Sequence, residues 1–110
     1  MFKIDPDNSM KLIRGDSAEF DIGVYIGEGE QEHEYTLEEG DVVTFTVKED
    51  TETEDVMLQK TGTHISILPE DTAEWNYGEY VYDVELKFAN GTTDTIIEPN
   101  TFSVLEEVTF

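Results

Sequence analysis

Residues 75–92 read Trp75-Asn76-Tyr77-Gly78-Glu79-Tyr80-Val81-Tyr82-Asp83-Val84-Glu85-Leu86-Lys87-Phe88-Ala89-Asn90-Gly91-Thr92, and this stretch decides the fold. Apolar side chains occupy its even positions from 80 to 88, and charged side chains occupy most odd positions from 79 to 87. Such alternation is typical of a strand with one buried face and one solvated face. We expect this strand to be the longest and to form the centre of the core. It ends in Asn90-Gly91, which predicts a hairpin turn because both residues tolerate positive φ.

Shorter runs of apolar residues lie on both sides of this stretch, separated by turn signals about every 8–12 residues. We expect strands over 9–14, 17–26, 41–48, 56–60, 64–68, 92–98 and 101–108, with a strand fragment at 35–37. Gly15-Asp16 and Thr61-Gly62 predict turns, and Pro99-Asn100 predicts a break between the last two strands. Residues 69–74 predict a single helical turn, because proline suits a first helical position.

This pattern predicts an all-β protein, an immunoglobulin-like β-sandwich of about seven to nine antiparallel strands with no substantial helix. A parallel sheet is not expected, because no helical stretch could serve as a crossover. We expect residues 1–8 to form a flexible lead-in and residues 9–110 to form one sandwich domain. Tyr80 follows a loop at the start of the central strand, which is the position of a tyrosine corner.

The charge balance is strongly acidic, with 27 acidic and 6 basic residues and a net charge of −21. Nucleic acids and anionic membranes are excluded as partners, because binding them needs clustered lysine and arginine. The acidic surface serves solubility or a basic partner. There is no cysteine, no signal-peptide pattern and no apolar run of about 20 residues. We therefore expect a soluble protein made in the cytoplasm.

Residues that could carry chemistry are scattered, so we expect no catalytic, cofactor-binding or metal-binding residues and no enzymatic activity. His33 and His64 share no ligand spacing, and the serines lack the context of a catalytic nucleophile. The expected cofactor is none. A structural calcium ion is the alternative, because two acidic segments, 49–55 and 70–74, offer carboxylates, although neither follows the pattern of a calcium-binding loop.

Three aromatic residues, Trp75, Tyr77 and Tyr25, are the candidate ligand or partner contacts, since exposed aromatics can stack on sugar rings. The alternative for Trp75 is a structural one, in which it plugs one end of the sandwich. Tyr80, Asn90 and Gly91 are the candidate structural residues. Arg14-Gly15-Asp16 spells the integrin-binding tripeptide, but its place between two apolar runs predicts a bend.

Motifs spread over about residues 10–108 resemble a known protein family. They are Arg14-Gly15-Asp16-Ser17, Tyr35-Thr36-Leu37, Gly40-Asp41, Val43, Phe45, Val47-Lys48, Gln59-Lys60, Ile67, Pro69-Glu70-Asp71-Thr72, Gly78, Tyr80, Tyr82-Asp83-Val84 and Phe102-Ser103-Val104. This pattern is similar to the N-terminal immunoglobulin-like domain of phage baseplate upper proteins and related tail structural proteins of phages that infect Gram-positive hosts. The run Glu70-Asp71-Thr72-Ala73 is also similar to the run before strand F of immunoglobulin variable domains.

The resemblance implies a non-enzymatic virion protein of a phage or prophage tail or baseplate, which acts in protein–protein assembly. The implied partners are other virion subunits or a second copy of the chain, with no nucleic acid and no membrane. The implied location is the bacterial cytoplasm during synthesis and the virion afterwards. A carbohydrate- or surface-ligand-binding β-sandwich module is the alternative function, and it would act through Trp75, Tyr77 and Tyr25.

Overall fold

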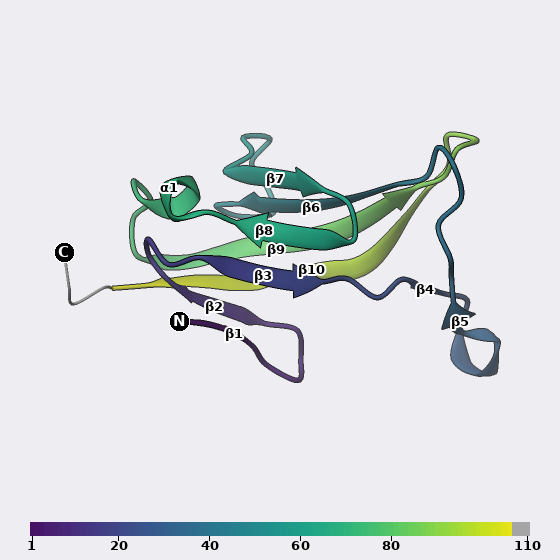
Figure 1. The fold of residues 1–110 in the computed structure, drawn as a ribbon, viewed down its shortest axis with the longest axis horizontal. Coiled ribbons are helices and arrows are strands. Elements are labelled where there is room, and N and C mark those ends of the chain that lie inside the picture. Colours follow the sequence, from purple (N-terminus) through teal and green to yellow (C-terminus); the bar gives the residue numbers. More distant parts are fainter. Residues whose placement is uncertain (107–110) are drawn as a thin grey trace.

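A computed structural model of the chain describes residues 1–106 and is almost entirely β-structure (Figure 1). Its elements in chain order are β1 (Phe2–Ile4), β2 (Met10–Ile13), β3 (Ala18–Asp21), β4 (Tyr25–Ile26), the 3₁₀ turn η1 (Gly29–Gln31), β5 (His33–Glu34), β6 (Val42–Lys48), β7 (Leu58–Thr61), β8 (His64–Ile67), α1 (Pro69–Thr72), β9 (Gly78–Lys87) and β10 (Thr93–Leu105). The prediction of an all-β protein is confirmed, and the single helical turn lies where it was expected.

Strand β9 is central in a six-stranded sheet, called sheet A here, whose order is β1-β2-β10-β9-β6-β7. It pairs antiparallel with β6 on one side and with β10 on the other. The predicted alternation is confirmed, because Tyr80, Tyr82, Val84 and Leu86 are all buried. Sheet A curls as a half-barrel around these side chains.

Strand β10 corrects two predictions, because it is a single strand of 13 residues and is longer than β9, which has 10. Pro99 does not break it. The register with β9 shifts between Thr95 and Ile97 and again between Ile97 and Asn100. Proline is tolerated at such bulges, since no ladder hydrogen bond needs its missing N–H. Val108, predicted at the end of this strand, lies outside the described residues.

The N-terminal segment contains a strand that was not predicted. Within the predicted lead-in, β1 pairs antiparallel with β2. Strand β2 then pairs with β10 in parallel, with Phe102 opposite Met10 and Val104 opposite Leu12. The expectation of antiparallel pairs alone is therefore wrong. A local pattern of apolar residues specifies a strand face and not the direction of the neighbouring strand.

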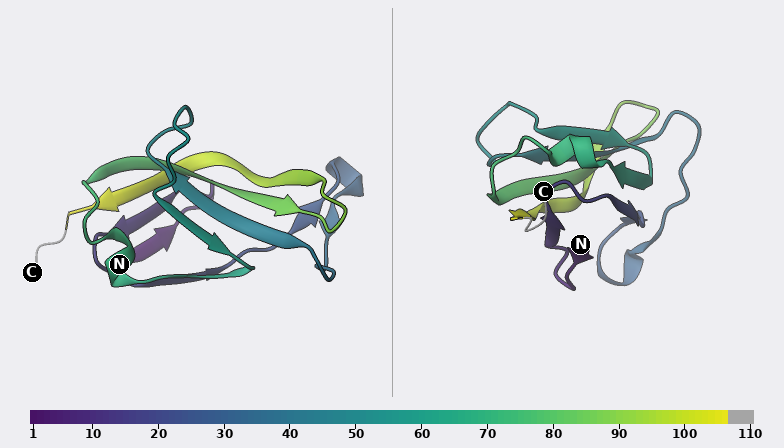
Figure 2. Two further views of the ribbon diagram at one scale, coloured as in Figure 1. Left: turned by 90° about the horizontal axis from the view of Figure 1, so that it is seen from above. Right: turned by 60° about the vertical axis from the view of Figure 1, so that its left-hand side comes forward.

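A second, smaller layer consists of β3 and β8, which pair antiparallel over four residues. The chain crosses to this layer directly after β7, so β7 and β8 belong to different sheets although only a short turn joins them. Figure 2 shows β3 and β8 on one side of sheet A. The predicted strand 17–26 is divided: β3 joins β8, whereas β4 pairs with β5 as a separate ribbon.

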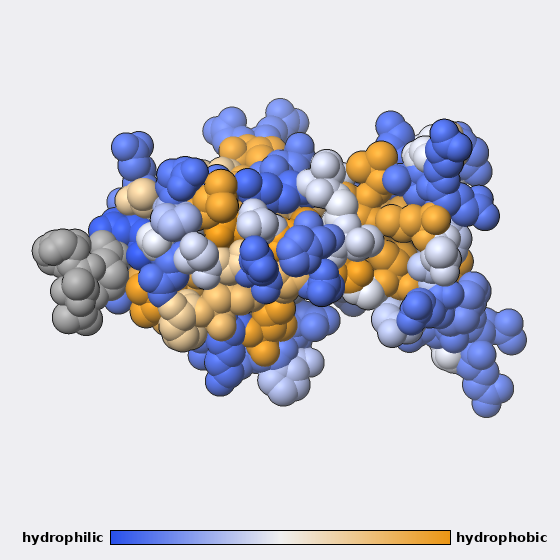
Figure 3. Space-filling model, viewed as in Figure 1, coloured by the Kyte–Doolittle hydropathy of each residue, from blue (hydrophilic) through white to orange (hydrophobic). Residues whose placement is uncertain are grey.

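The β3–β8 layer covers only part of sheet A. At the end of the molecule that holds the β9–β10 hairpin, hydrophobic atoms are visible at the surface (Figure 3). Several hydrophobic residues packed against the core are correspondingly only half-buried, among them Tyr35, Leu37, Phe88 and Ile97. The core is therefore less completely covered at this end of the molecule. No helix within residues 1–106 has the length and apolar character needed to cross a membrane.

Candidate functional site

Trp75 lies inside the molecule. Its side chain is 8% exposed, and its ring packs 4.9 Å from that of Tyr80 and 6.2 Å from that of Phe102, measured between ring centroids. The ring is therefore part of the buried core, against two residues of sheet A. This burial favours the structural alternative over a ligand contact.

Arg14 holds the segment around Trp75 from the outside. Its Nη1 donates to the Trp75 carbonyl oxygen at 3.0 Å, and its Nη2 donates to Tyr77 Oη at 2.8 Å. The guanidinium carbon lies 4.3 Å from the centre of the Tyr77 ring, a cation–π contact. The turn after Arg14 is tied to the same region, because Gly15 N donates to Thr72 Oγ1 at 3.1 Å. Arg14-Gly15-Asp16 thus forms the predicted bend, docked against α1 and the loop that follows.

Tyr25 lies far from Trp75 and Tyr77. It is 51% exposed on β4, at the opposite end of the long axis from α1 (Figure 1). There it lines an open hollow of about 390 Å³, together with Ile4, Phe20, Ile96 and Ile97. The three aromatics predicted as contacts therefore do not form one surface, and a sugar platform that requires all three is not assembled.

The candidate structural residues make the contacts expected of them. Tyr80 Oη donates to the Asn76 carbonyl oxygen at 2.7 Å, which is the bond of a tyrosine corner. In the β9–β10 turn, Asn90 Oδ1 accepts from the Thr92 backbone N–H at 3.0 Å. Gly91 has φ of +93°, a left-handed conformation that glycine adopts without strain. These residues set the position and register of β9.

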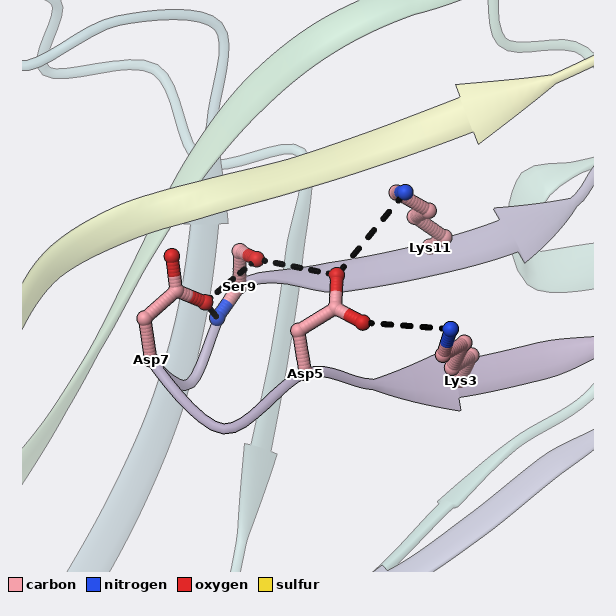
Figure 4. Close-up of polar contacts among 5 residues, drawn as sticks. All are labelled: Lys3, Asp5, Asp7, Ser9 and Lys11. Atoms are coloured by element: carbon pink, nitrogen blue, oxygen red, sulfur yellow. Dashed lines mark hydrogen bonds and ion pairs between the residues drawn. The ribbon is translucent and has the colours of Figure 1, made fainter.

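Two of the six basic residues, Lys3 and Lys11, lie on the β1–β2 hairpin (Figure 4). Asp5 lies between them, with Oδ1 at 3.4 Å from Lys3 Nζ and Oδ2 at 3.8 Å from Lys11 Nζ. In the connecting turn, Ser9 Oγ donates to Asp7 Oδ1 at 2.7 Å, and this bond is the main cause that lowers the pKa of Asp7. The cluster closes the hairpin by local contacts.

The acidic segments make contacts within the fold. Asp50 Oδ1 accepts from the backbone N–H groups of Glu52 and Thr53, both at 2.9 Å. Asp71 Oδ2 accepts from Leu68 N at 2.8 Å and lies 3.1 Å from Lys60 Nζ. Within residues 1–106, no three histidine, aspartate or glutamate side chains gather into a group that could hold a metal ion.

The two histidines lie on different small sheets. His33 is on β5, whereas His64 on β8 faces Asp21 on β3, with 2.8 Å between Nδ1 and Oδ1. The hydrogen bond with Asp21 is the main cause that raises the pKa of His64. This pair is a cross-strand contact on an exposed face, and it links the two strands of the second layer.

One concave surface was not predicted. It lies on the outer face of sheet A, which faces away from β3 and β8, and it is a hollow of about 410 Å³. Its lining comes from β6, β7, β9, β10 and the loop between β6 and β7, and it comprises Thr44, Thr46, Lys48, Asp50, Thr51, Val56, Gln59, Val81, Tyr82, Asp83, Glu85 and Pro99. The loop between β6 and β7 rises from this side of the sheet (Figure 2, left). The hollow is therefore walled by a loop rather than cut into the core.

The electrostatics of this hollow centre on Asp83. Removal from water is the main cause that raises the pKa of Asp83 above its ordinary value, while Lys48 acts in the opposite direction. A sequence signal for the surface existed: the odd positions of β9 carry Asp83 and Glu85, and the outward positions of β6 carry Thr44 and Thr46. The sequence does not show that β6 and β9 are neighbours. Their pairing places Thr44 opposite Glu85 and Thr46 opposite Asp83, so the two polar rows lie side by side.

Comparison with known proteins finds no family model, no curated protein and no solved structure that matches this chain.

Proposed function

We propose that this chain is a non-enzymatic immunoglobulin-like β-sandwich that acts as an assembly module in the tail or baseplate of a phage or prophage. Its partners in this proposal are neighbouring virion subunits. The proposal combines the strand order, the contacts among the motif residues and the surfaces that the fold leaves uncovered.

The strand order is the observation that carries the proposal. In immunoglobulin-like sandwiches, strands B and E are neighbours in one sheet, and strands G, F, C and C′ are consecutive in the other. Here β3 and β8 are neighbours in the small layer, and β10, β9, β6 and β7 are consecutive in sheet A. Taken in chain order, these strands correspond to B, C, C′, E, F and G. Tyr80 lies near the start of the strand that corresponds to F, which is where a tyrosine corner belongs.

The motifs that carry the phage resemblance contact one another across the fold. Tyr35 Oη donates to Asp41 Oδ2 at 2.6 Å, and Asp41 Oδ1 accepts from Ala89 N at 2.9 Å. Lys60 pairs with Asp71, and Gly15 N bonds to Thr72. Because these residues are engaged in holding the strands and turns together, the resemblance supports a shared scaffold. The function of such a scaffold lies in the surfaces that it presents.

The exposed surfaces support assembly as that function. Within residues 1–106, the outer face of sheet A is uncovered and hollowed, and β7 pairs on one side only, with β6. Uncovered sheet faces and edges are surfaces on which proteins join their neighbours. By contrast, the sugar-binding alternative relies on Trp75, which is buried, and on Tyr25, which lies at the other end of the molecule.

Purified particles test the proposal. In a lysate of a host that produces the corresponding phage or prophage particles, we expect the chain to co-sediment with intact tails. Quantitative mass spectrometry should then find it at a fixed ratio to the major tail proteins. A chain that stays in the particle-free fraction, while the other tail proteins sediment, would contradict a structural role in the virion.

A further inference from the structure

The outer face of sheet A is an unpartnered sheet face with a defined shape. Strands β6, β7 and β9 form its floor, and the loop after β6 and Pro99 on β10 form its sides. Its volume of about 410 Å³ falls in the range of about 300–1,000 Å³ that suits a small ligand or a few side chains of a partner. Among the described residues, the core covers the opposite face of the same strands, whereas this face is open to a neighbour.

The charges on this face favour binding of a cationic group. Asp83 and Glu85 lie on neighbouring outward positions of β9, and Asp50 lies in the loop that forms one wall. Lys48 is the one basic side chain in the lining. Asp83 is partly withdrawn from water, and this desolvation raises its pKa. A cationic group that enters the hollow would offset part of this cost, because opposite charges stabilise each other more strongly where water is excluded.

The remaining lining residues are polar hydroxyl and amide groups and small apolar groups. Gln59 Nε2 donates to Thr46 Oγ1 at 3.2 Å. This bond links the polar side chains of β6 and β7 across the floor of the hollow. Val81 adds an apolar patch to the floor, and Val56 and Pro99 add apolar patches to the sides. Lysine and arginine side chains combine an aliphatic stem with a charged head, so they match a surface that mixes apolar walls with carboxylates.

We propose that this face docks a cationic segment of a neighbouring subunit, with a lysine or arginine side chain directed at Asp83 and its aliphatic stem against Val56 and Val81. The inference rests on the proposed assembly function and names the partner's chemistry. Charge repulsion disfavours a second copy of the chain as the occupant of this surface. Two copies would each bring a net charge of −21, and two such faces would bring carboxylates together.

A peptide and two double variants test the site. The probe is a hexapeptide of alternating lysine and valine with blocked termini, titrated into the full isotope-labelled chain at near-physiological salt. We expect the amide signals that shift to gather on β6, β7 and β9. Asp83→Asn with Glu85→Gln should weaken binding about tenfold, a loss typical of removing partly desolvated charge partners. The matched control is Glu28→Gln with Glu30→Gln, which removes the same charge from an exposed loop and should change affinity less than about twofold.

Three outcomes would overturn the inference. If both double variants weaken binding equally, the peptide responds only to the overall charge of the chain. If the shifting signals are spread over the whole surface, there is no defined site. If spermidine produces the same shifts with the same affinity, the hollow binds small polyamines rather than a protein segment. Circular dichroism and thermal unfolding of each variant confirm that the fold is retained.

The particle assay separates this inference from the function on which it rests. Absence of the wild-type chain from purified tails would contradict the proposed function itself. If the wild-type chain is present and the Asp83→Asn, Glu85→Gln variant is incorporated equally well, only the docking face is wrong. Loss of the double variant, with retention of the Glu28→Gln, Glu30→Gln control, would support both.

Discussion

The two faces of β9 share one backbone and have opposite surroundings. On the inner face, Tyr82, Val84 and Leu86 are almost completely removed from water, and each contacts the close-packed core. On the outer face, Asp83 and Glu85 face a hollow that no other part of the described chain covers. The inner face therefore determines whether the chain folds, because packing there responds to the loss of any group. The outer face is free to determine what the folded protein contacts.

The largest effect should come from breaking the inner face at Phe45. This ring is fully buried, and it lies 5.4 Å from the rings of both Phe20 and Tyr82, between centroids. We expect Phe45→Ala to lower the free energy of unfolding by about 3–5 kcal/mol, because the cavity adds to the lost burial. The neighbouring Thr44 points to the outer face, and Thr44→Ala should change the free energy of unfolding by less than about 0.5 kcal/mol. Urea denaturation of both variants measures the contrast, and similar losses would show that the two faces are not energetically distinct.

A smaller effect is expected at the start of β9, where the tyrosine corner positions the strand. Tyr80→Phe removes only the hydroxyl that bonds to the Asn76 carbonyl oxygen. The expected loss is about 1 kcal/mol, the net contribution of one such hydrogen bond. Tyr25→Phe is the control, because that hydroxyl lies on an exposed ring. Thermal unfolding checks both, and a Tyr80→Phe variant as stable as the wild type would mean that packing alone holds the corner.

The register at the other end of β9 is held by Asp41, and acid should release it. The hydrogen bond from Tyr35 is the main cause that lowers the pKa of Asp41, and backbone N–H groups of Glu38 and Ala89 act in the same direction. A carboxyl with a lowered folded-state pKa stabilises the fold above its unfolded pKa, and this contribution is lost as the pH falls through the folded pKa. The pKa of Tyr35 is raised to about 12, so its hydroxyl remains a donor throughout.

We therefore expect Asp41→Asn to unfold at a lower temperature than the wild type at pH 7. The difference should shrink as the pH falls below about 4, where the wild-type carboxylate is increasingly protonated. The control is Asp94→Asn, at an exposed position on β10. Thermal unfolding over a pH series gives the comparison. A difference between Asp41→Asn and the wild type that stays constant with pH would rule out the ionised carboxylate as its cause.

The smallest effect, with the opposite sign, is expected on the outer face. Desolvation raises the pKa of Asp83, so its ionised form is less stable in the folded state than in the unfolded state. Such a group stabilises the fold below its unfolded pKa, and that contribution is lost as the pH rises through the folded pKa. Asp83→Asn should therefore raise the melting temperature slightly at pH 7, and this increase should disappear at about pH 3.

Glu85→Gln is the matched control for Asp83→Asn, because it changes an exposed carboxylate on the same face. A decrease in the melting temperature of Asp83→Asn would show that the electrostatic attraction of Lys48 outweighs the desolvation of Asp83. An increase would support the view that this face is adapted to a partner at some cost to the stability of the isolated chain.

Local sequence patterns predicted the features that depend on neighbouring residues. The alternation from Tyr80 to Leu86 predicted the buried face, Asn90-Gly91 predicted the hairpin turn, and Pro69 marked the single helical turn. Each depends on periodicity or on the conformational preferences of one or two residues. The residues that stabilise the turns were thus recognisable before the structure.

Predictions failed where a feature depends on residues from other segments of the chain. Pro99 looked like a strand break, but the bulges of β10 accommodate it within one continuous strand. Trp75, Tyr77 and Tyr25 looked like one group, but the fold buries the first, stacks Arg14 on the second and places the third at the opposite end. No pattern within a single segment encodes these relations, because each depends on residues in other strands or loops of the fold.

The sequence by itself determined the β class, the inward face of β9, the turns and the acidic character of the surface, because these follow from periodicity, glycine and proline conformations and composition. Only the tertiary structure decided the parallel pairing of β2 with β10, the separation of β3 and β8 into a second layer, and the alignment of Thr44 and Thr46 with Glu85 and Asp83. The physical reason is that strand pairing joins backbone groups, which are the same in every residue. Neighbours are therefore selected by how the buried faces pack together, and that selection formed the hollow on the outer face.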